Sequence, residues 1–258
     1  MRNKGFRITH ILALCLALCL SPAAQAAQEP TTVRVAIAAN LSALVPSLKE
    51  AFESQTGHEL EVSLGSSGKL LAQIVHGGPY DVFVSADRSR PRKAQEAGAA
   101  VPDTNFTYAR GRLALIGTAL PAESAPEEAL KTVLSKASRF AMANPRTAPY
   151  GLATQETLQS LALWDQHSAK SVLGESVVQA WQFVRSGNIP AGFVAKSQLA
   201  EGEEHIPVPA SLHNPIDQDA VLLKRGKDNP AARDFMGFLK SATARAILQE
   251  SGYDLPPL

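Results

Sequence analysis

The sequence predicts an α/β protein of two lobes, with the second lobe inserted into the first. Short β-rich apolar runs alternate with helical patterns, which is typical of βαβ units and a mainly parallel sheet. Two proline-containing loops, at 118–128 and 201–215, are each soon followed by a strand pattern. We therefore expect the chain to leave the first lobe near 108–112 and to return to it near 209–219.

Each expected element has an ordinary local signal. The expected strands cover 33–38, 60–64, 81–85, 112–117, 139–143, 191–194 and 220–224. Helices are expected at 67–76, 149–163 and 177–186, and Pro46 fits an early turn of another helix. The resulting lobe boundaries are 27–109 with 214–258 for the first lobe and 110–213 for the second.

The first 26 residues have the pattern of a secretion signal. Three basic residues precede a short apolar run at 8–20, and Ala-Gln-Ala at 24–26 is a small-x-small cleavage site. The apolar run is too short to span a bilayer comfortably. Cys15 and Cys19 each follow a leucine, whereas lipidation would require a small residue there. We therefore expect a soluble protein exported to the bacterial periplasm, with residues 1–26 removed by cleavage after Ala26.

The composition of the remaining chain excludes several kinds of chemistry. Both cysteines lie in the signal, so disulfides, thiolate catalysis and Cys-ligated metals are excluded from the mature chain. Removal of the signal lowers the formal charge from +1 to about −2, which leaves no basic surface typical of nucleic-acid binding. The remaining histidines are scattered and form no pair at metal-binding spacing. We expect no cofactor and no nucleic-acid partner.

Four expected helix starts carry small or hydroxyl-bearing residues, at 40–42, 66–68, 149–151 and 175–177. A helix start has unpaired backbone N–H groups and a partial positive charge, so converging starts would hold an anion without any Lys or Arg. Such a site only donates hydrogen bonds, which suits a fully deprotonated oxyanion. Glu175 is the only carboxylate near these turns, and we expect it to act as a helix-start residue rather than as a ligand.

The serines of the second turn allow other interpretations. Residues 65–69 (GSSGK) suggest a phosphate loop, but the first glycine of that motif and its magnesium-binding hydroxyl residue are missing. Ser67 as a nucleophile would make the protein an exported serine hydrolase, although no Gly-x-Ser-x-Gly elbow accompanies it. Ser66 and Ser67 could also simply cap a helix.

Several segments, in this order and spacing, resemble the periplasmic molybdate-binding proteins, which are the substrate-capturing components of molybdate ABC importers. These segments are 35–41 (VAIAANL), 65–74 (GSSGKLLAQI), 78–87 (GPYDVFVSAD), 144–151 (NPRTAPYG) and 187–194 (GNIPAGFV). The resemblance runs from Val33 to about Pro256. It implies a type II periplasmic-binding fold, with two α/β lobes, an inter-lobe cleft and two crossover hinges.

The resemblance also implies which residues bind the oxyanion. Asn40 stands where many members have Ser, and its side-chain amide would donate in place of the hydroxyl. Ser67 matches the hydroxyl of the second turn, while Tyr150 and Val177 match positions that donate backbone N–H groups. Two weaker candidates are Ala39 and Ser66.

One position departs from the pattern of the family. Some members place a Tyr hydroxyl on the anion after Gly-x-Val, and here Ala195 follows Gly-Phe-Val at 192–194. Asn40 would compensate for this missing donor.

The resemblance implies a binding protein rather than an enzyme. Its ligand would be molybdate, and also tungstate because the two have nearly the same size and charge. Molybdenum would be present only as the bound oxyanion, and the partners would be the membrane subunits of an ABC importer. We expect a monomer. A binder of sulfate or another small oxyanion, and a hydrolase using Ser67, are the alternative functions.

Edman sequencing of the protein isolated from the periplasm should begin at Ala27, because Ala24 and Ala26 supply the small residues that signal peptidase requires. A mature chain that begins at an acylated cysteine would contradict the expectation of a soluble protein.

Overall fold

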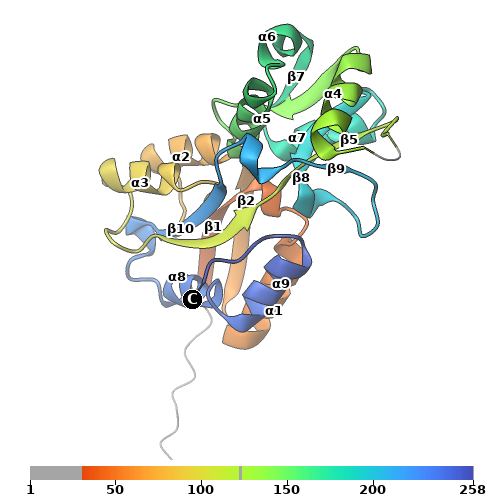
Figure 1. The fold of residues 1–258 in the computed structure, drawn as a ribbon. Helices are drawn as coiled ribbons and strands as arrows, with labels where there is room; N and C mark the ends of the chain where they lie inside the picture. Colours follow the sequence, from red (N-terminus) through yellow and green to blue (C-terminus); the bar gives the residue numbers. More distant parts are fainter. Residues whose placement is uncertain (1–30, 122–123, 258) are drawn as a thin grey trace, which may run out of the picture.

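The computed structural model describes residues 31–121 and 124–257, which form two α/β lobes (Figure 1). The first lobe, in the lower part of Figure 1, contains a five-stranded sheet of order β2-β1-β3-β10-β4. The second lobe, above it, contains a five-stranded sheet of order β7-β6-β8-β5-β9. Within the described ranges, no helix has the length and apolar character needed to cross a membrane.

The first sheet draws its strands from two separate parts of the chain. They are β1 (Thr32–Ala38), β2 (Glu59–Gly65), β3 (Val82–Val84), β4 (Phe106–Gly111) and β10 (Ile216–Leu222). Strand β1 lies between β2 and β3 and is parallel to both, whereas β10 is antiparallel to β3 and β4. The helical elements of this lobe are η1 (Ala39–Leu41), α1 (Val45–Thr56), α2 (Ser67–Val75), α3 (Ser89–Glu96), η5 (Lys224–Gly226), α8 (Pro230–Phe238) and α9 (Ala242–Glu250).

The second sheet repeats this mixed arrangement. Its strands are β5 (Leu113–Gly117), β6 (Phe140–Ala143), β7 (Ser171–Gly174), β8 (Ala191–Ala195) and β9 (Ile206–Pro207). Strand β6 is parallel to β7 and β8, whereas β5 is antiparallel to β8 and β9. The helical elements are α4 (Pro126–Lys136), α5 (Pro149–Ser160), α6 (Trp164–His167), η2 (Ser168–Lys170), α7 (Val177–Arg185), η3 (Lys196–Gln198) and η4 (Ala210–Leu212).

The chain passes between the two sheets twice. It leaves the first sheet after Gly111 and enters the second at Leu113; it leaves the second after Pro207 and enters the first again at Ile216. The predicted α/β fold with two lobes is therefore confirmed. The residue-level lobe boundaries, 27–109 with 214–258 and 110–213, stay predictions, and the expected signal at 1–26 lies outside the described residues.

The expectation of a mainly parallel sheet is wrong, because both sheets are mixed. The strand that follows each passage, β5 or β10, is antiparallel to its neighbours. A strand that enters a sheet from the other lobe is not the product of a βαβ crossover, so the rule that makes such units parallel does not apply to it.

Strand β10 starts at Ile216, earlier than the expected range 220–224. The expected range was too short because the polar residues at 217–219 interrupt the apolar pattern that was used to assign strands. Two of these residues, Gln218 and Asp219, are at most 1% exposed. Asp219 accepts a hydrogen bond from Thr107 Oγ1 at 2.7 Å, so its buried carboxylate has a partner.

Other elements differ from expectation at their ends. Helix α5 ends at Ser160, short of 163, because Ala162 has a left-handed backbone conformation with φ of 57°. The expected loop at 118–128 contains the start of α4, and the expected loop at 201–215 contains the short strand β9. Strands β4 and β7 were not expected, because polar residues interrupt the apolar pattern of β4 and the apolar run of β7 is only Val172 and Leu173.

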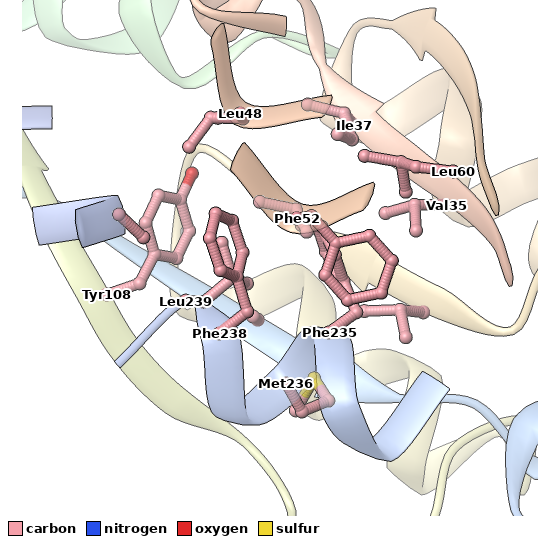
Figure 2. Packing of buried hydrophobic residues seen from close by; sticks show 14 of the residues in the cluster. Val35, Ile37, Leu48, Phe52, Leu60, Tyr108, Phe235, Met236, Phe238 and Leu239 are labelled. Carbon is pink, nitrogen blue, oxygen red and sulfur yellow. The ribbon is translucent and has the colours of Figure 1, made fainter. Parts of the chain in front are cut away.

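An aromatic cluster fills the core between the first sheet and its helices. Figure 2 shows Phe52 of α1 beside Phe235 and Phe238 of α8. The ring of Phe52 meets Phe235 edge-on, with centroids 5.3 Å apart, and Phe238 at 5.6 Å. Such edge contacts add to the stabilisation from burial. The cluster also contains Val35 of β1, so it helps to hold the strand that leads into η1.

Replacement of Phe52 by alanine should lower the free energy of unfolding by about 3–5 kcal/mol, because it leaves a cavity in this fully buried cluster. Urea denaturation followed by circular dichroism would measure the loss. Val75→Ala is the control, because Val75 is 46% exposed and its truncation should change stability by less than about 0.5 kcal/mol. Equal effects of the two changes would contradict this account of the core.

Candidate anion-binding site

A small cavity lies between the two lobes, where four helix starts converge. The residues that line it are Ala38, Ala39, Asn40, Ser66, Ser67, Ala86, Ala148, Pro149, Tyr150, Ser176 and Val177. All six candidate residues named from the sequence are therefore brought together on its wall. Ala195 is not among the lining residues, and its methyl side chain provides no donor.

The serines at the start of α2 keep their donor capacity. Ser67 Oγ accepts a hydrogen bond from the N–H of Ala86 at 3.0 Å, which leaves the hydroxyl proton of Ser67 free to donate. Ser66 occupies the N-cap position, but its side chain makes no capping bond and its buried Oγ has no partner. The interpretation of Ser66 as a simple cap is therefore wrong for its side chain. A buried hydroxyl without a partner beside a cavity is expected to bind a ligand or water.

The second lobe contributes two further helix starts. Helix α5 begins at Pro149 and Tyr150, and helix α7 begins at Val177. The N–H groups of Tyr150 and Val177 lie in first turns, where no intrahelical acceptor exists. The preceding Ser176 uses its Oγ to accept a bond from the N–H of Gln179 at 3.4 Å, so it caps α7. The second lobe therefore offers these backbone N–H groups to the cavity, together with the hydroxyl proton of Ser176, which the capping bond does not use.

Contacts between residues next to the cavity wall join the two lobes. The N–H of Gly68 donates to the carbonyl of Thr147 at 2.9 Å, and a Cβ at Gly68 would lie only 2.9 Å from that carbonyl oxygen. A glycine is therefore needed for this close approach. Lys69 Nζ pairs with Glu175 Oε2 at 2.6 Å. Glu175 thus contacts a lysine of the other lobe and is not among the described residues that line the cavity.

Among the residues that the structure describes, none with a charged side chain lines the cavity. Asp81 and Asp87 flank strand β3 but serve structural contacts: Asp81 pairs with Arg225, and Asp87 pairs with Arg90. No group of three or more His, Cys, Asp or Glu residues that could hold a metal ion occurs within 31–121 and 124–257. The lining residues include no histidine that could act as a general base for Ser67, so the geometry does not support hydrolysis.

A buried polar network adjoins the cavity, and the sequence analysis missed most of it. Asn40 Nδ2 donates to Gln218 Oε1 at 2.9 Å and to Tyr253 OH at 2.8 Å, while Asn40 Oδ1 is buried without a partner. Tyr108 OH lies 2.8 Å from Gln218 Oε1, and Gln218 Nε2 donates to Tyr150 OH at 3.2 Å. Gln218 was missed because the expected strand began after it, so the face on which it lies was not assigned.

The tyrosines of this network are neutral. Burial raises the pKa of Tyr108 and of Tyr150 well above the usual 10.0, and it raises the pKa of Tyr253 to about 12. Each phenol therefore keeps its proton at physiological pH and can both donate and accept a hydrogen bond. The network thus brings no negative charge next to the cavity.

The chain matches a protein family and curated relatives over most of its length. The family model described as "Bacterial extracellular solute-binding protein" matches residues 33–254. A protein named "Molybdate-binding protein ModA" from Rhodobacter capsulatus is 42% identical, over 94% of this chain and 93% of the relative. A protein of the same name from Azotobacter vinelandii is 39% identical, over 97% of this chain and 99% of the relative.

Two solved structures are similar to this chain in fold. The periplasmic molybdate-binding protein of Azotobacter vinelandii gives a TM-score of 0.80 at 38% identity, covering 87% of this chain and 100% of that chain. The sulfate-binding protein SubI of Mycobacterium tuberculosis H37Rv gives a TM-score of 0.70 at 14% identity, covering 86% of each chain. The second likeness concerns the fold alone.

Alkaline titration should reveal the buried phenols. The raised pKa values mean that the folded protein holds protons that the unfolded chain releases, so stability present below about pH 10 is lost as the pH rises towards 12. Tyrosinate absorbance should therefore appear at higher pH in native protein than in urea-unfolded protein. The Tyr108→Phe variant should lose less stability than wild type over the same pH range, and identical losses would contradict the assignment to this phenol.

Proposed function

Because the chain belongs to the family of bacterial extracellular solute-binding proteins, we propose that it captures molybdate and delivers it to an ABC importer. Members of this family bind solutes and are not enzymes, so the protein is a transport component without catalytic residues. The relatives named as molybdate-binding proteins span nearly the whole chain, which supports molybdate as the ligand.

The observation that carries the proposal is the donor character of the cavity. Its wall offers the hydroxyls of Ser66 and Ser67 and first-turn N–H groups at Tyr150 and Val177, without any charged side chain. An oxyanion that carries no proton can accept from all of these groups at once, and hydrogen bonds to a charged acceptor are stronger than neutral ones. We propose Asn40, Ser67, Tyr150 and Val177 as the ligand set, with Ser66 and Ala39 contributing beside them.

The geometry supports binding of a fully deprotonated oxyanion more strongly than binding of a protonated one. Hydrogen phosphate carries an O–H group that would favour an acceptor carboxylate in the site, and the described residues that line the cavity include no carboxylate. Sulfate carries no proton and is discriminated only by its smaller size, so it is the competing ligand in any test. Tungstate has nearly the same size and charge as molybdate, and we propose that it binds as well.

The expectations for location and partners follow from the same assignment. We propose that the signal at 1–26 directs the protein to the periplasm, where it presents its ligand to the membrane subunits of the importer. We propose that it does so as a monomer, with no nucleic-acid partner and no resident cofactor. Molybdenum enters the site only as the oxyanion.

Anion binding should also favour closure of the lobes. Asn40 and Ser67 belong to the first lobe, whereas Tyr150 and Val177 belong to the second. Neither lobe alone can offer all of the donors, so the bound anion stabilises the arrangement that brings both sets together.

Two measurements test the proposed function. Mass spectrometry of protein purified from molybdate-supplemented cells should detect bound molybdenum in stoichiometric amount. Calorimetry on ligand-free protein should show tight binding of molybdate and tungstate and much weaker binding of sulfate and phosphate. Tighter binding of sulfate than of molybdate would instead support the alternative oxyanion binder, and turnover of generic esters would support the hydrolase.

Ser67→Ala should weaken molybdate binding by about 1–3 kcal/mol, roughly tenfold to a hundredfold, because the anion loses a charge-assisted hydroxyl donor. Val177→Ala is the matched control: it also truncates a buried residue on the cavity wall, but only the backbone of Val177 is asked to donate. Calorimetry should therefore show a much smaller loss for Val177→Ala. The reverse ranking would mean that the backbone donors are wrongly assigned.

A further inference from the structure

The side-chain amides of Asn40 and Gln218 form a buried pair beside the cavity. Both residues are at most 1% exposed, and Asn40 lies on the cavity wall. Both N–H bonds of Asn40 Nδ2 are used, one towards Gln218 Oε1 and one towards Tyr253 OH. The only other polar atom of this side chain is Oδ1, which has no partner. In this arrangement the side-chain oxygen Oδ1 is the polar atom of Asn40 that remains available to a ligand in the cavity.

This first arrangement is unfavourable for an anion. A carbonyl oxygen carries partial negative charge and can only accept, so it repels an oxyanion that has no proton to give. The unpaired oxygen is also costly in the absence of ligand, because a buried acceptor without a donor loses its hydration without compensation.

A second arrangement exists in which oxygen and nitrogen are exchanged in both amides together. The heavy-atom distances stay the same, because amide oxygen and nitrogen have nearly the same shape. Asn40 Oδ1 then accepts from Gln218 Nε2 at 2.9 Å and from Tyr253 OH at 2.8 Å. Gln218 Oε1 accepts from Tyr150 OH at 3.2 Å. The amide nitrogen of Asn40 takes the position that had no partner, with its protons available to the cavity.

The two amides cannot exchange independently. If Asn40 alone turned over, its oxygen would face Gln218 Oε1 at 2.9 Å, and two acceptors would oppose each other. Two other members of the network, Tyr108 and Tyr253, are compatible with both arrangements. Tyr108 OH can donate to the carbonyl of Ser85 at 3.1 Å and accept from Gln218. Tyr253 OH donates to the backbone carbonyl of Asn40 at 3.2 Å in the first arrangement and to Asn40 Oδ1 in the second, while Ser197 Oγ still donates to that backbone carbonyl at 3.1 Å. The orientation of Gln218 therefore dictates that of Asn40.

We propose that Gln218 is a positioning residue for the anion: its amide orientation decides whether Asn40 offers an N–H donor or a carbonyl acceptor to the cavity. A fully deprotonated oxyanion selects the donor arrangement. This inference rests on the proposed function, and it adds a residue that does not line the cavity.

The amide pair also links the two lobes. Gln218 lies on β10 of the first lobe, whereas Tyr150 lies in the first turn of α5 in the second. The phenol of Tyr150 accepts from Gln218 in the first arrangement and donates to it in the second. A side chain at Gly111 would overlap the Tyr150 hydroxyl and lie 2.6 Å from Gln218 Nε2, so glycine is required there. The selected amide arrangement therefore sets the direction of a hydrogen bond that joins the two lobes.

A double-mutant cycle tests whether Gln218 acts through Asn40. Gln218→Met keeps the approximate shape of the side chain but removes its hydrogen bonds, and calorimetry should show about a tenfold loss of molybdate affinity. In an Asn40→Ser background, where no amide remains to be oriented, the same change should cost less than about twofold. An equal loss in both backgrounds, or no loss in either, would overturn the proposal. Gln95→Met is the matched control, because Gln95 bonds to Val101 and Asn105 and lies outside the cavity wall.

Nuclear magnetic resonance of ¹⁵N-labelled wild-type protein provides a measurement that does not require the variant to fold. Saturation with molybdate should shift the side-chain NH₂ signals of both Asn40 and Gln218 and leave that of Gln95 in place. An unchanged Gln218 signal, together with calorimetric binding, would overturn the positioning role while the proposed function stands. Failure of wild-type protein to bind molybdate at all would instead refute the proposed function.

Discussion

Parallel strands that end in register bring the helix starts together, and the candidate site depends on this constraint. In the first lobe β1 and β2 end side by side, with Ala38 opposite Gly65. In the second lobe β6 and β7 do the same, with Ala143 opposite Gly174. Each of these strands is followed within a few residues by a helical start: η1, α2, α5 or α7. Because first-turn N–H groups have no intrahelical acceptor, each lobe presents a pair of donor sites at the edge of its sheet.

The buried hydrogen bonds that join the lobes next to the cavity connect uncharged groups, so they place no negative charge beside a bound anion. The Gln218–Tyr150 bond joins the lobes next to the cavity, and Ser197 Oγ donates to the carbonyl of Asn40 at 3.1 Å. The raised pKa values of the tyrosines keep the phenols protonated, so no tyrosinate opposes the ligand. A buried network of this kind is specific because every member must find a partner. The unpaired Oδ1 of Asn40 is the one conspicuous exception in it, and it lies in the residue that faces the cavity.

The sequence was sufficient for those features that depend on local chemistry. Ser-Ser-Gly after a β-rich run, and proline at the first position of a helix, are local signals, so the starts of α2 and α5 were placed correctly. Features that depend on residues far apart in the sequence could not be predicted from local patterns. Gln218 looks like a loop residue until Asn40 and Tyr108 surround it, and β10 is antiparallel because it returns from the other lobe. The direction in which Asn40 turns its amide is likewise set by a residue far away in the chain.

A cage of neutral donors also makes affinity depend on closure. Two unit charges 4 Å apart interact by about 1 kcal/mol in water and about 4 kcal/mol at an effective dielectric constant of 20. Hydrogen bonds to an anion likewise become stronger when closure excludes water and lowers the local dielectric constant. A lysine inside the cavity would attract the anion in the open form as well. Here Lys69 lies outside the cavity wall and is paired with Glu175 across the lobes. Separation of the lobes would break that pair, admit water to the N–H groups and take the donors of one lobe away from the anion. On the proposed function, the importer therefore needs only to open the lobes to release the ligand.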